Sequence, residues 1–298
     1  MSAYVIDGRA AAQALRSEVL AEVKALEETG VRPGLATVLV GEDYAAQAYE
    51  RRVRRLAADL DVAYFHEVLP CDAELADVLA AVGKLNADPR VHGVLVLRPL
   101  PHHIPDEVVF AHLDPLKDVE SVHPYNAGLL VEGTPRFVPS TPASCYRLID
   151  TYLEAAGLDK EAFYRRSAIC VVGRSANVGR PALLLGIARG AVVISCDEFA
   201  YRAGRLAEHT RLGDVVIVAA GVPKLIGQNE VRRGAVVIDV GINPVTDTAT
   251  GKVGLVGDVD FDAVAEVAAA ITPVPGGVGP VTDVWLLRNT VVAAKLQS

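Results

Sequence analysis

Long apolar runs, clustered cysteines and a leading signal segment are all missing from this sequence. No stretch approaches the roughly 20 apolar residues that span a bilayer, and the N-terminus lacks the basic-then-apolar pattern of a signal peptide. The four cysteines are widely spaced, without a C-x-x-C pair or a Cys/His cluster, which argues against a disulfide framework or a metal site. These absences predict a cytoplasmic protein that binds neither a metal nor a membrane.

An excess of positive charge is missing as well. The 298 residues include 29 Lys and Arg against 37 Asp and Glu, a formal net charge of −8. An acidic chain offers no electrostatic reason to bind nucleic acid. One dense basic run exists, and we interpret it as a solvated helix face; it consists of Arg51, Arg52, Arg54 and Arg55.

What the sequence does contain is a regular alternation of helical and strand patterns. In the first half, helices are predicted at 10–29, 45–59 and 73–86, and strands at 35–40, 62–69 and 91–97. In the second half, strands are predicted at 167–172, 192–196, 215–219 and 236–240, with helices at 143–156 and 282–296. Such alternation predicts an α/β fold in which helices cover parallel sheets.

The segment 168–181 carries the first functional signal. A buried-strand pattern, 168–172, leads into Gly173-Arg174-Ser175-Ala176-Asn177-Val178-Gly179-Arg180-Pro181 and then into an apolar helix. A glycine-rich turn between strand and helix brings backbone N–H groups and a helix N-terminus to a pyrophosphate. The spacing is G-x-x-x-x-x-G rather than G-x-G-x-x-G, so an ordinary tight turn between strand and helix is an equal alternative.

The next strand ends in two carboxylates, Asp197 and Glu198, about 20 residues after the glycines. Carboxylates at this point accept hydrogen bonds from an adenosine ribose and repel a 2′-phosphate, which favours NAD over NADP. A solvated turn is the alternative interpretation. Arg174 argues for NADP instead, because a guanidinium can clamp a phosphate.

Four segments together resemble the methylenetetrahydrofolate dehydrogenase/cyclohydrolase family. They are 93–101 (G-V-L-V-L-R-P-L-P), 117–128, 173–181 (G-R-S-A-N-V-G-R-P) and 272–282 (T-P-V-P-G-G-V-G-P-V-T), supported by 239–243 and 257–259. Their order is kept over almost the whole chain. The resemblance implies an N-terminal three-layer α/β domain (1–142 and 277–298) and a Rossmann-type NAD(P)-binding domain (143–276).

The family resemblance also implies an activity. Its members oxidise 5,10-methylenetetrahydrofolate by hydride transfer to NAD(P), most also hydrolyse the methenyl product, and they are typically homodimers. The cofactor, NAD or NADP, carries the hydride chemistry, while the protein supplies orientation and electrostatics. A folate-like small molecule is therefore the expected partner.

Carried over position by position, the resemblance reveals departures at the catalytic residues. Tyr49 matches a tyrosine that lies along the folate's aromatic part, but Val53 stands where the family has a lysine. Leu97 replaces the glutamine that pairs with that lysine. Valine and leucine transfer no proton, and an arginine neighbour, Arg52 or Arg54, is only an electrostatic substitute because it stays charged. We therefore expect weak or absent cyclohydrolase activity.

Glu120 stands where the family has an aspartate that holds the pterin's amino-pyrimidine edge, and Ser121 replaces the following glycine. The remaining expected substrate contacts are Pro99, Leu100, Gly276, Gly277, Val278 and Pro280. The expected cofactor contacts are Gly173, Arg174, Ser175, Val178, Gly179, Pro181, Asp197, Glu198, Ala220, Gly221, Ile242 and Thr282. For Glu120 a surface-loop acid is the alternative interpretation, and for Gly276 to Pro280 it is a hinge between domains.

Two other functions fit these departures. The chain is then either a divergent relative with a changed substrate or a catalytically silent ligand-binding protein, since a fold alone does not fix a function. A silent protein gives no NAD(P)-dependent absorbance change with any folate, whereas an enzyme with a changed substrate still binds NAD(P).

Overall fold

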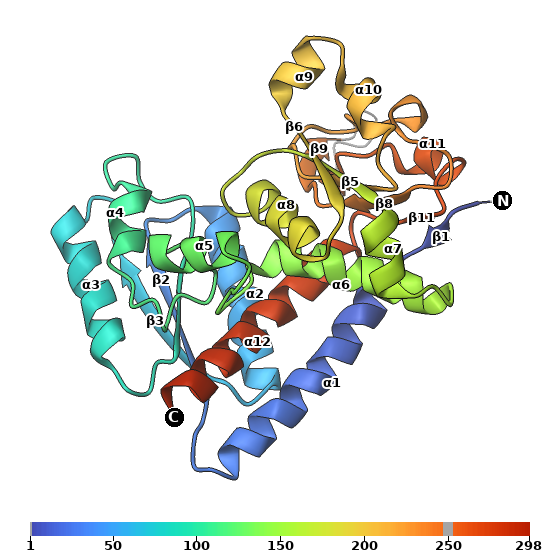
Figure 1. The fold of residues 1–298 in the computed structure, drawn as a ribbon. Helices are drawn as coiled ribbons and strands as arrows, with labels where there is room; N and C mark the ends of the chain where they lie inside the picture. The colour runs from blue at the N-terminus through green and yellow to red at the C-terminus, as the bar shows by residue number, and fades with distance from the viewer. Residues whose placement is uncertain (1, 247–252) are drawn as a thin grey trace. The chain divides into compact units, whose positions relative to one another are not determined.

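The computed structural model describes residues 2–246 and 253–298. Two compact units make up the chain: the first comprises residues 1–13 and 141–282, and the second comprises 14–140 and 283–298. The boundaries fall within the first helix, near the start of α6 and within the last helix (Figure 1). Each unit has its own parallel sheet, so the predicted two-domain α/β architecture is confirmed.

The first unit is built on a six-stranded parallel sheet in the order β1-β11-β8-β7-β5-β6. Its strands are β1 (Tyr4–Val5), β5 (Ala168–Val172), β6 (Val192–Cys196), β7 (Val215–Val218), β8 (Val236–Asp239) and β11 (Ala270–Ile271). A separate antiparallel pair consists of β9 (Asn243–Thr246) and β10 (Val253–Val256). The chain moves outward from β5 in both directions, which is the doubly wound order of dinucleotide-binding sheets.

Apolar side chains cover both faces of this sheet. Cys170, Val216 and Val237 face one core together with Leu206, whereas Ile169 faces the opposite side beside Gly186. Successive strand residues point to opposite faces, so both faces are buried and the strands read as continuous apolar runs. The helices of this unit are α6 (Ser140–Ala155), α7 (Lys160–Arg166), α8 (Gly179–Ala188), α9 (Glu198–Arg202), α10 (Leu206–Thr210), η1 (Gln228–Glu230) and α11 (Phe261–Ala265).

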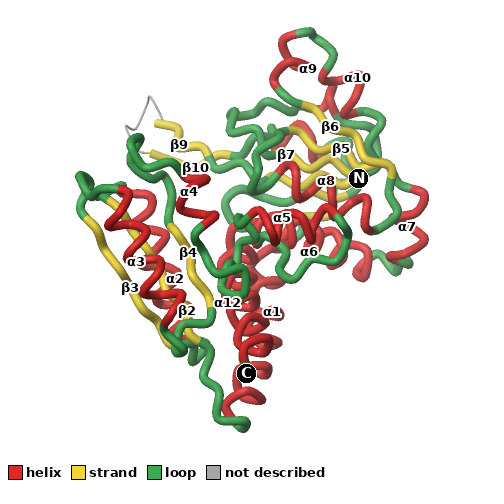
Figure 2. Tube along the Cα trace, turned by 60° about the vertical axis from the view of Figure 1, so that its left-hand side comes forward, coloured by secondary structure: helices red, strands yellow, loops and turns green. Residues whose placement is uncertain are grey.

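The second unit has a three-stranded parallel sheet in the order β3-β2-β4, with β2 (Gly34–Val40) in the centre (Figure 2). The outer strands are β3 (Ala63–Leu69) and β4 (Gly93–Val96), and every residue of β2 and β4 is buried. Helices α2 (Tyr44–Asp59) and α3 (Leu75–Ala87) pack against the sheet. Its other helices are α4 (Asp106–Ala111) and α5 (Pro124–Val131), together with most of α1 (Gly8–Glu27) and α12 (Val278–Gln297).

Two arrangements differ from the sequence-based expectation. Residues 1–13 were expected with 14–142, yet β1 pairs in parallel with β11 and so adds a strand to the larger sheet. Residues 277–282 also fall in the first unit, while 283–298 join the second. Two-residue strands such as β1 and β11 leave no periodic signal, which is why the sequence did not predict them. None of the helices within residues 2–246 and 253–298 combines the length and the apolar composition that a membrane span requires.

Candidate active site

The predicted site residues divide between the two units. The first unit holds all expected cofactor contacts and the loop residues Gly276, Gly277, Val278 and Pro280. The second holds Tyr49, Val53, Leu97, Pro99, Leu100 and Glu120. The expected site thus consists of a dinucleotide half-site in the first unit and, in the second, a carrier half-site for the folate-like one-carbon carrier.

The turn after β5 has the tight geometry that its glycines predict. Gly173 has φ +112°, and a Cβ there would lie 2.1 Å from the Ala219 carbonyl oxygen. A Cβ on Gly179 would lie 2.0 Å from the Gly173 carbonyl oxygen. Any side chain at either position displaces backbone, so the glycines bring the turn close to both β7 and the N-terminus of α8. The Ser175 hydroxyl accepts a 3.4 Å hydrogen bond from the Gly179 N–H.

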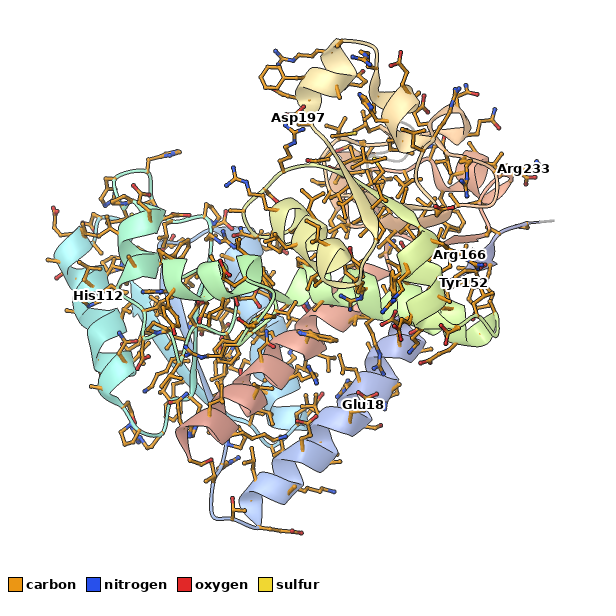
Figure 3. All side chains as sticks on the ribbon, viewed as in Figure 1. Glu18, His112, Tyr152, Arg166, Asp197 and Arg233 are labelled. Carbon is orange, nitrogen blue, oxygen red and sulfur yellow. The ribbon has the colours of Figure 1, made fainter. Side chains whose placement is uncertain are left out.

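Arg174 is held by three hydrogen bonds at the end of β6. Its Nε donates to the Ser195 hydroxyl at 2.8 Å, its Nη2 to the Ser195 carbonyl at 3.0 Å, and its Nη1 to Asp197 Oδ2 at 2.6 Å. Asp197 stands where β6 passes into α9 (Figure 3), and its Oδ1 accepts the Phe199 N–H. Glu198 instead faces Arg202 in an exposed pair at 3.6 Å. The two neighbouring acids thus have different surroundings.

A pocket of about 310 Å³ adjoins this turn. Six of the sequence-predicted cofactor contacts line it: Gly173, Arg174, Ser175, Asp197, Glu198 and Ala220. Its remaining wall is largely apolar and was not predicted from sequence: Val172, Tyr201, Leu206, Ala219, Val222 and Leu225. A mostly apolar slot with a few polar groups at its rim suits a planar base attached to a sugar.

Two buried carboxylates shape the neighbouring strand ends. Asp258 Oδ2 accepts the Ala220 and Gly221 N–H groups at 2.7 and 2.8 Å, and Asp258 Oδ1 accepts from the Asn243 side chain at 2.8 Å. Asp239 accepts the N–H groups of residues 241, 258 and 259. Burial raises the pKa of Asp239 to about 6. The motifs at 239–243 and 257–259 therefore form one hydrogen-bonded support beneath the expected cofactor contacts.

The glycines of these two motifs are explained by the same carboxylates. A Cβ on Gly241 would lie 2.2 Å from Asp258 Oδ1, and a Cβ on Gly257 would lie 1.8 Å from Asp239 Oδ2. Ile242, an expected cofactor contact between them, is 60% exposed. Its exposure leaves it available to a ligand.

The proline- and glycine-rich loop before α12 is tightly folded. Gly276 has φ +109°, and a Cβ on Gly277 would lie 2.6 Å from the Pro273 carbonyl oxygen. The Thr282 hydroxyl donates to the Val278 carbonyl at 3.2 Å, one helical turn earlier. The glycines are therefore required by the loop's own backbone.

In the second unit, α2 carries Tyr49 and Val53 one turn apart, so the two side chains share a helix face. Val53 is fully buried and Leu97 is 3% exposed. Neither side chain can donate a proton, and burial leaves no room for water to take their place. The predicted replacement of an acid–base pair by apolar groups is thus accompanied by close packing.

Glu120 is the titratable group of this half-site. Its carboxylate accepts a short hydrogen bond from the Ser140 hydroxyl. Burial raises its pKa to about 7, with Ser140 opposing the shift, Asp118 adding to it and Arg98 opposing it. Burial also raises the pKa of Tyr49, and the charges of Glu120 and Asp283 raise it further. Tyr49 and Glu120 therefore lie in one electrostatic neighbourhood.

The loop that carries Glu120 is fixed on both sides. Asn289 of α12 donates to the Val119 and Val138 carbonyls at 2.7 and 2.8 Å. Ser121 adopts φ +53°, a conformation unusual for a residue with a Cβ, and its hydroxyl donates to the Phe137 carbonyl at 2.7 Å. This hydrogen bond offsets the unfavourable conformation that arises because Ser121 stands where the family motif has a glycine.

The residues just before Glu120 have structural partners. Buried Lys117 donates to the Leu85 and Asp88 carbonyls at the end of α3, where a cation also complements the helix dipole. Asp118, fully buried, accepts from the Asn126 side chain and from two backbone N–H groups. This Lys-Asp pair thus serves to place the loop.

A partly buried polar chain that links β2 and β3 to Glu50 of α2 was not predicted from sequence. The hydroxyl of Thr37 pairs with the Tyr64 hydroxyl at 2.6 Å and with His66 Nδ1 at 2.8 Å, and Tyr64 donates to Glu50 at 2.9 Å. Period-two alternation in β3 is the only signal that could have indicated such a chain. These groups satisfy one another and support α2 from below.

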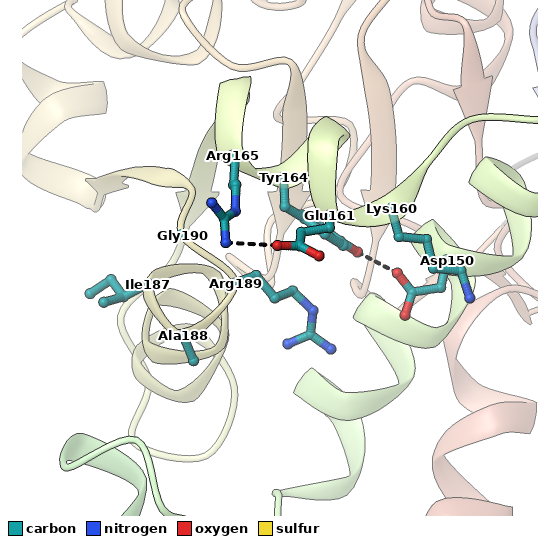
Figure 4. A pocket seen from close by; sticks show the side chains of 9 residues that line it. All are labelled: Asp150, Lys160, Glu161, Tyr164, Arg165, Ile187, Ala188, Arg189 and Gly190. Atoms are coloured by element: carbon teal, nitrogen blue, oxygen red, sulfur yellow. Dashed lines mark hydrogen bonds and ion pairs between the residues drawn. The ribbon is translucent and has the colours of Figure 1, made fainter.

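Another hollow, of about 840 Å³, lies among α6, α7 and α8 of the first unit (Figure 4). Two contacts lie within it: Tyr164 donates to Asp150 at 2.7 Å, and Arg165 faces Glu161 at 2.7 Å. Arg189 stacks on Tyr146 at 4.2 Å and caps α8 through the Leu185 carbonyl. Stability at a helix end explains this cluster. No group of three or more potential metal ligands occurs among residues 2–246 and 253–298.

Known proteins resemble this chain over its whole length. A protein of Rubrobacter xylanophilus named Bifunctional protein FolD 3 is 64% identical over 99% of this chain and 93% of the relative. The crystal structure of a bifunctional methylenetetrahydrofolate dehydrogenase/cyclohydrolase from Campylobacter jejuni is 34% identical, with TM-score 0.90 and full coverage of both chains. A Trypanosoma brucei enzyme of the same name, complexed with NADP cofactor and inhibitor, is 35% identical with TM-score 0.90, covering 99% of this chain and 98% of its own.

Family models match both halves. Residues 6–120 match the catalytic domain of tetrahydrofolate dehydrogenase/cyclohydrolase, and residues 139–298 match its NAD(P)-binding domain. The two sheets, the glycine turn and the order of motifs agree with that assignment. The chain belongs to the tetrahydrofolate dehydrogenase/cyclohydrolase family.

Proposed function

We propose that this protein is a 5,10-methylenetetrahydrofolate dehydrogenase in which hydride transfer outweighs hydrolysis. The observation that carries the proposal is the contrast at the carrier half-site. Tyr49 and Glu120 keep an aromatic face and a carboxylate, whereas positions 53 and 97 hold buried apolar side chains. Hydride transfer depends mainly on the alignment of two rings, and hydrolysis depends on proton transfer to and from water.

The first unit fits a nicotinamide dinucleotide. The glycine turn has no space for a Cβ at positions 173 and 179, and an apolar pocket of about 310 Å³ lies beside it. A dinucleotide bound there would supply the hydride acceptor. The N-terminus of α8 and the turn's N–H groups would hold its pyrophosphate, and Tyr201 and Leu206 would line the pocket for its adenine.

NAD is the favoured cofactor. Asp197 engages the Arg174 guanidinium at 2.6 Å, and Ser195 takes two further donors of the same group. An arginine held in this way has fewer donors left for a 2′-phosphate, and the carboxylate adds repulsion. The opposing fact is that the Trypanosoma brucei relative was solved with NADP.

The carrier ring is held by Tyr49 and Glu120. The carboxylate accepts hydrogen bonds from the amino-pyrimidine edge, as its longer side chain replaces the family's aspartate. Oxidation of the carrier creates a positive charge on the one-carbon bridge, and an ionised Glu120 stabilises that charge. No lysine stands on the Tyr49 face of α2 to oppose it, since Val53 occupies that position.

Hydrolysis of the methenyl product is the weaker activity in this proposal. The similar proteins carry names that assign them both activities. In this chain a water-activating group is missing at positions 53 and 97, and Glu120 is the carboxylate among the expected residues of this half-site.

One assay tests these statements together. Purified protein is mixed with 5,10-methylenetetrahydrofolate and either NAD or NADP, and reduced nicotinamide and methenyl product are followed at their separate absorbances. We expect both to accumulate together, faster with NAD. Reduced cofactor without accumulating methenyl product contradicts the weak hydrolase activity. No reaction with either cofactor contradicts the folate assignment and leaves a changed substrate or a silent protein.

A further inference from the structure

The basic run on α2 contains one arginine that differs from its neighbours. Arg54 pairs with Glu50 of its own helix at 3.5 Å. Arg55 is exposed and contacts no carboxylate among the described residues. Arg52 instead places its guanidinium carbon 5.0 Å from the centre of the Tyr49 ring, one helical turn away. A solvated helix face therefore describes Arg55 but not Arg52.

Arg52 is fixed above that ring by a carboxylate from another helix. Its Nε donates to Asp283 Oδ2 at 2.5 Å, and its Nη2 approaches Asp283 Oδ1 at 3.4 Å. Two donors on one carboxylate define the plane of the guanidinium as well as its position. The Asp283 side chain is only 12% exposed, whereas that of Arg52 is 58% exposed. Asp283 is thus the rigid partner, and Arg52 extends from it across the tyrosine.

The same cluster includes the titratable groups around Tyr49. The charges of Glu120 and Asp283 raise the pKa of the tyrosine hydroxyl, and the charge of Arg52 lowers it. All four groups belong to the second unit. With valine at position 53, Arg52 is the cation that acts on this hydroxyl.

We propose that Arg52, held by Asp283, is a positioning residue that covers one face of the Tyr49 ring and leaves the other face for the flat carrier. The inference rests on the proposed function and deepens it. A guanidinium stacked on an aromatic ring restricts the ring's rotation and orients its free face. The chain thereby keeps a fixed cation beside the carrier without a group that transfers protons, because arginine stays charged.

The test compares Arg52→Gln with Arg55→Gln, a matched change of charge on the same helix. We expect Arg52→Gln to raise the KM for methylenetetrahydrofolate about tenfold. This is the size of effect expected from the loss of the cation–π contact with Tyr49 and of the pairing with Asp283. The KM for the dinucleotide and kcat should each change less than threefold. Arg52→Lys keeps the charge without the planar fork and should recover only part of the loss. Arg55→Gln should match the wild type.

A double substitution shows whether Arg52 acts through the ring. In a Tyr49→Leu background, Arg52→Gln should have little further effect on the KM for the carrier. Two results overturn the proposal: Arg52→Gln kinetics equal to those of Arg55→Gln, or a full additional loss in the Tyr49→Leu background. An equal decline of every kinetic constant together with a lower Tm identifies a purely structural role and also overturns it.

A measurement without substrate separates this inference from the proposed function. Thermal unfolding of Arg52→Gln, Asp283→Asn and the double variant tests the pairing directly. We expect non-additive losses of stability, because either single change leaves its partner unpaired. If the wild type proves inactive with folate, the proposed function fails while this cycle still tests the pairing. Additive losses show that Arg52 and Asp283 are not coupled, which removes the basis of the positioning role.

Discussion

At the scale of single residues, Glu120 determines the pH response of the carrier half-site. Burial raises its pKa from 4.5 to about 7. We expect kcat/KM for methylenetetrahydrofolate to rise as pH increases through about 7, because the ionised form accepts the carrier's N–H groups and stabilises its positive charge. Glu120→Gln should lower kcat/KM by roughly 10- to 100-fold and remove this dependence, since hydrogen bonds to charged groups contribute about 1.5–3 kcal/mol.

Glu120→Asp serves as the control because it keeps the carboxylate and should keep a pH-dependent profile. An unchanged profile in Glu120→Gln shows that another group controls the response.

The raised pKa of Glu120 also has a consequence for the stability of the fold. The native state binds the Glu120 proton more tightly than the unfolded state does. Protonated Glu120 therefore adds to the free energy of unfolding below about pH 4.5, and this stabilisation is lost as pH rises through about 7.

Ser121 tests the backbone that presents Glu120. Its positive φ is unfavourable for any residue with a Cβ, by about 1 kcal/mol, and its hydroxyl bond to Phe137 contributes about the same amount in return. Ser121→Ala keeps the unfavourable conformation and loses the bond, so the free energy of unfolding should fall by about 1 kcal/mol. Ser121→Gly loses the hydrogen bond but also removes the unfavourable conformation, so the free energy of unfolding should hardly change. Chemical denaturation measures both, and equal losses would refute this account.

Single-residue roles were only partly predictable from the sequence. Gly173 and Gly179 follow from spacing, because a tight turn needs residues without a Cβ. Ser195 and Tyr201 were missed, since a serine within a strand and a tyrosine on a short helix carry no motif. The partner of Arg52, Asp283, is 231 positions away in the sequence, and no local pattern connects two such positions.

At the scale of elements, most helices and strands were predictable because they are long and periodic. The predicted 35–40 and 45–59 compare with Gly34–Val40 and Tyr44–Asp59. The sequence did not predict the antiparallel pair of β9 and β10, because its short strands alternate weakly. Nor did it reveal that motifs from separate strand ends share hydrogen bonds through Asp239 and Asp258.

Asp258 therefore provides a test at the element scale. Its carboxylate accepts three donors while fully buried. An amide at this position presents its own N–H₂ group to at least one of those donors. Asp258→Asn should therefore lower the free energy of unfolding by about 1–3 kcal/mol and weaken NAD binding.

Asp260→Asn is the matched control, because this acid faces Lys224 in a more exposed pair. Its free energy of unfolding should stay within about 0.5 kcal/mol of the wild type. Denaturation and calorimetric titration with NAD measure both, and equal effects in the two variants would contradict the role of Asp258.

At the scale of the whole molecule, the two half-sites belong to separate compact units. Arg174 pairs with Asp197 within the first unit, and Glu120 accepts a hydrogen bond from Ser140 within the second. The first unit buries its own apolar cluster, as does the second. A substitution in one half-site should therefore leave binary binding at the other intact, because binding energy is set by local contacts when sites share no partners.

Binding of each ligand alone tests this independence. Arg174→Ala should weaken NAD binding about tenfold or more, because Asp197, the expected partner of the ribose, loses the guanidinium that holds it in place, while the Kd for a folate stays within twofold. Glu120→Gln should weaken folate binding and leave the Kd for NAD unchanged. Calorimetric titrations of both variants with both ligands give the four values. If Glu120→Gln also weakens NAD binding, the two half-sites are energetically coupled before catalysis. The residues at positions 53, 97 and 120 alone would then not explain the preference for hydride transfer.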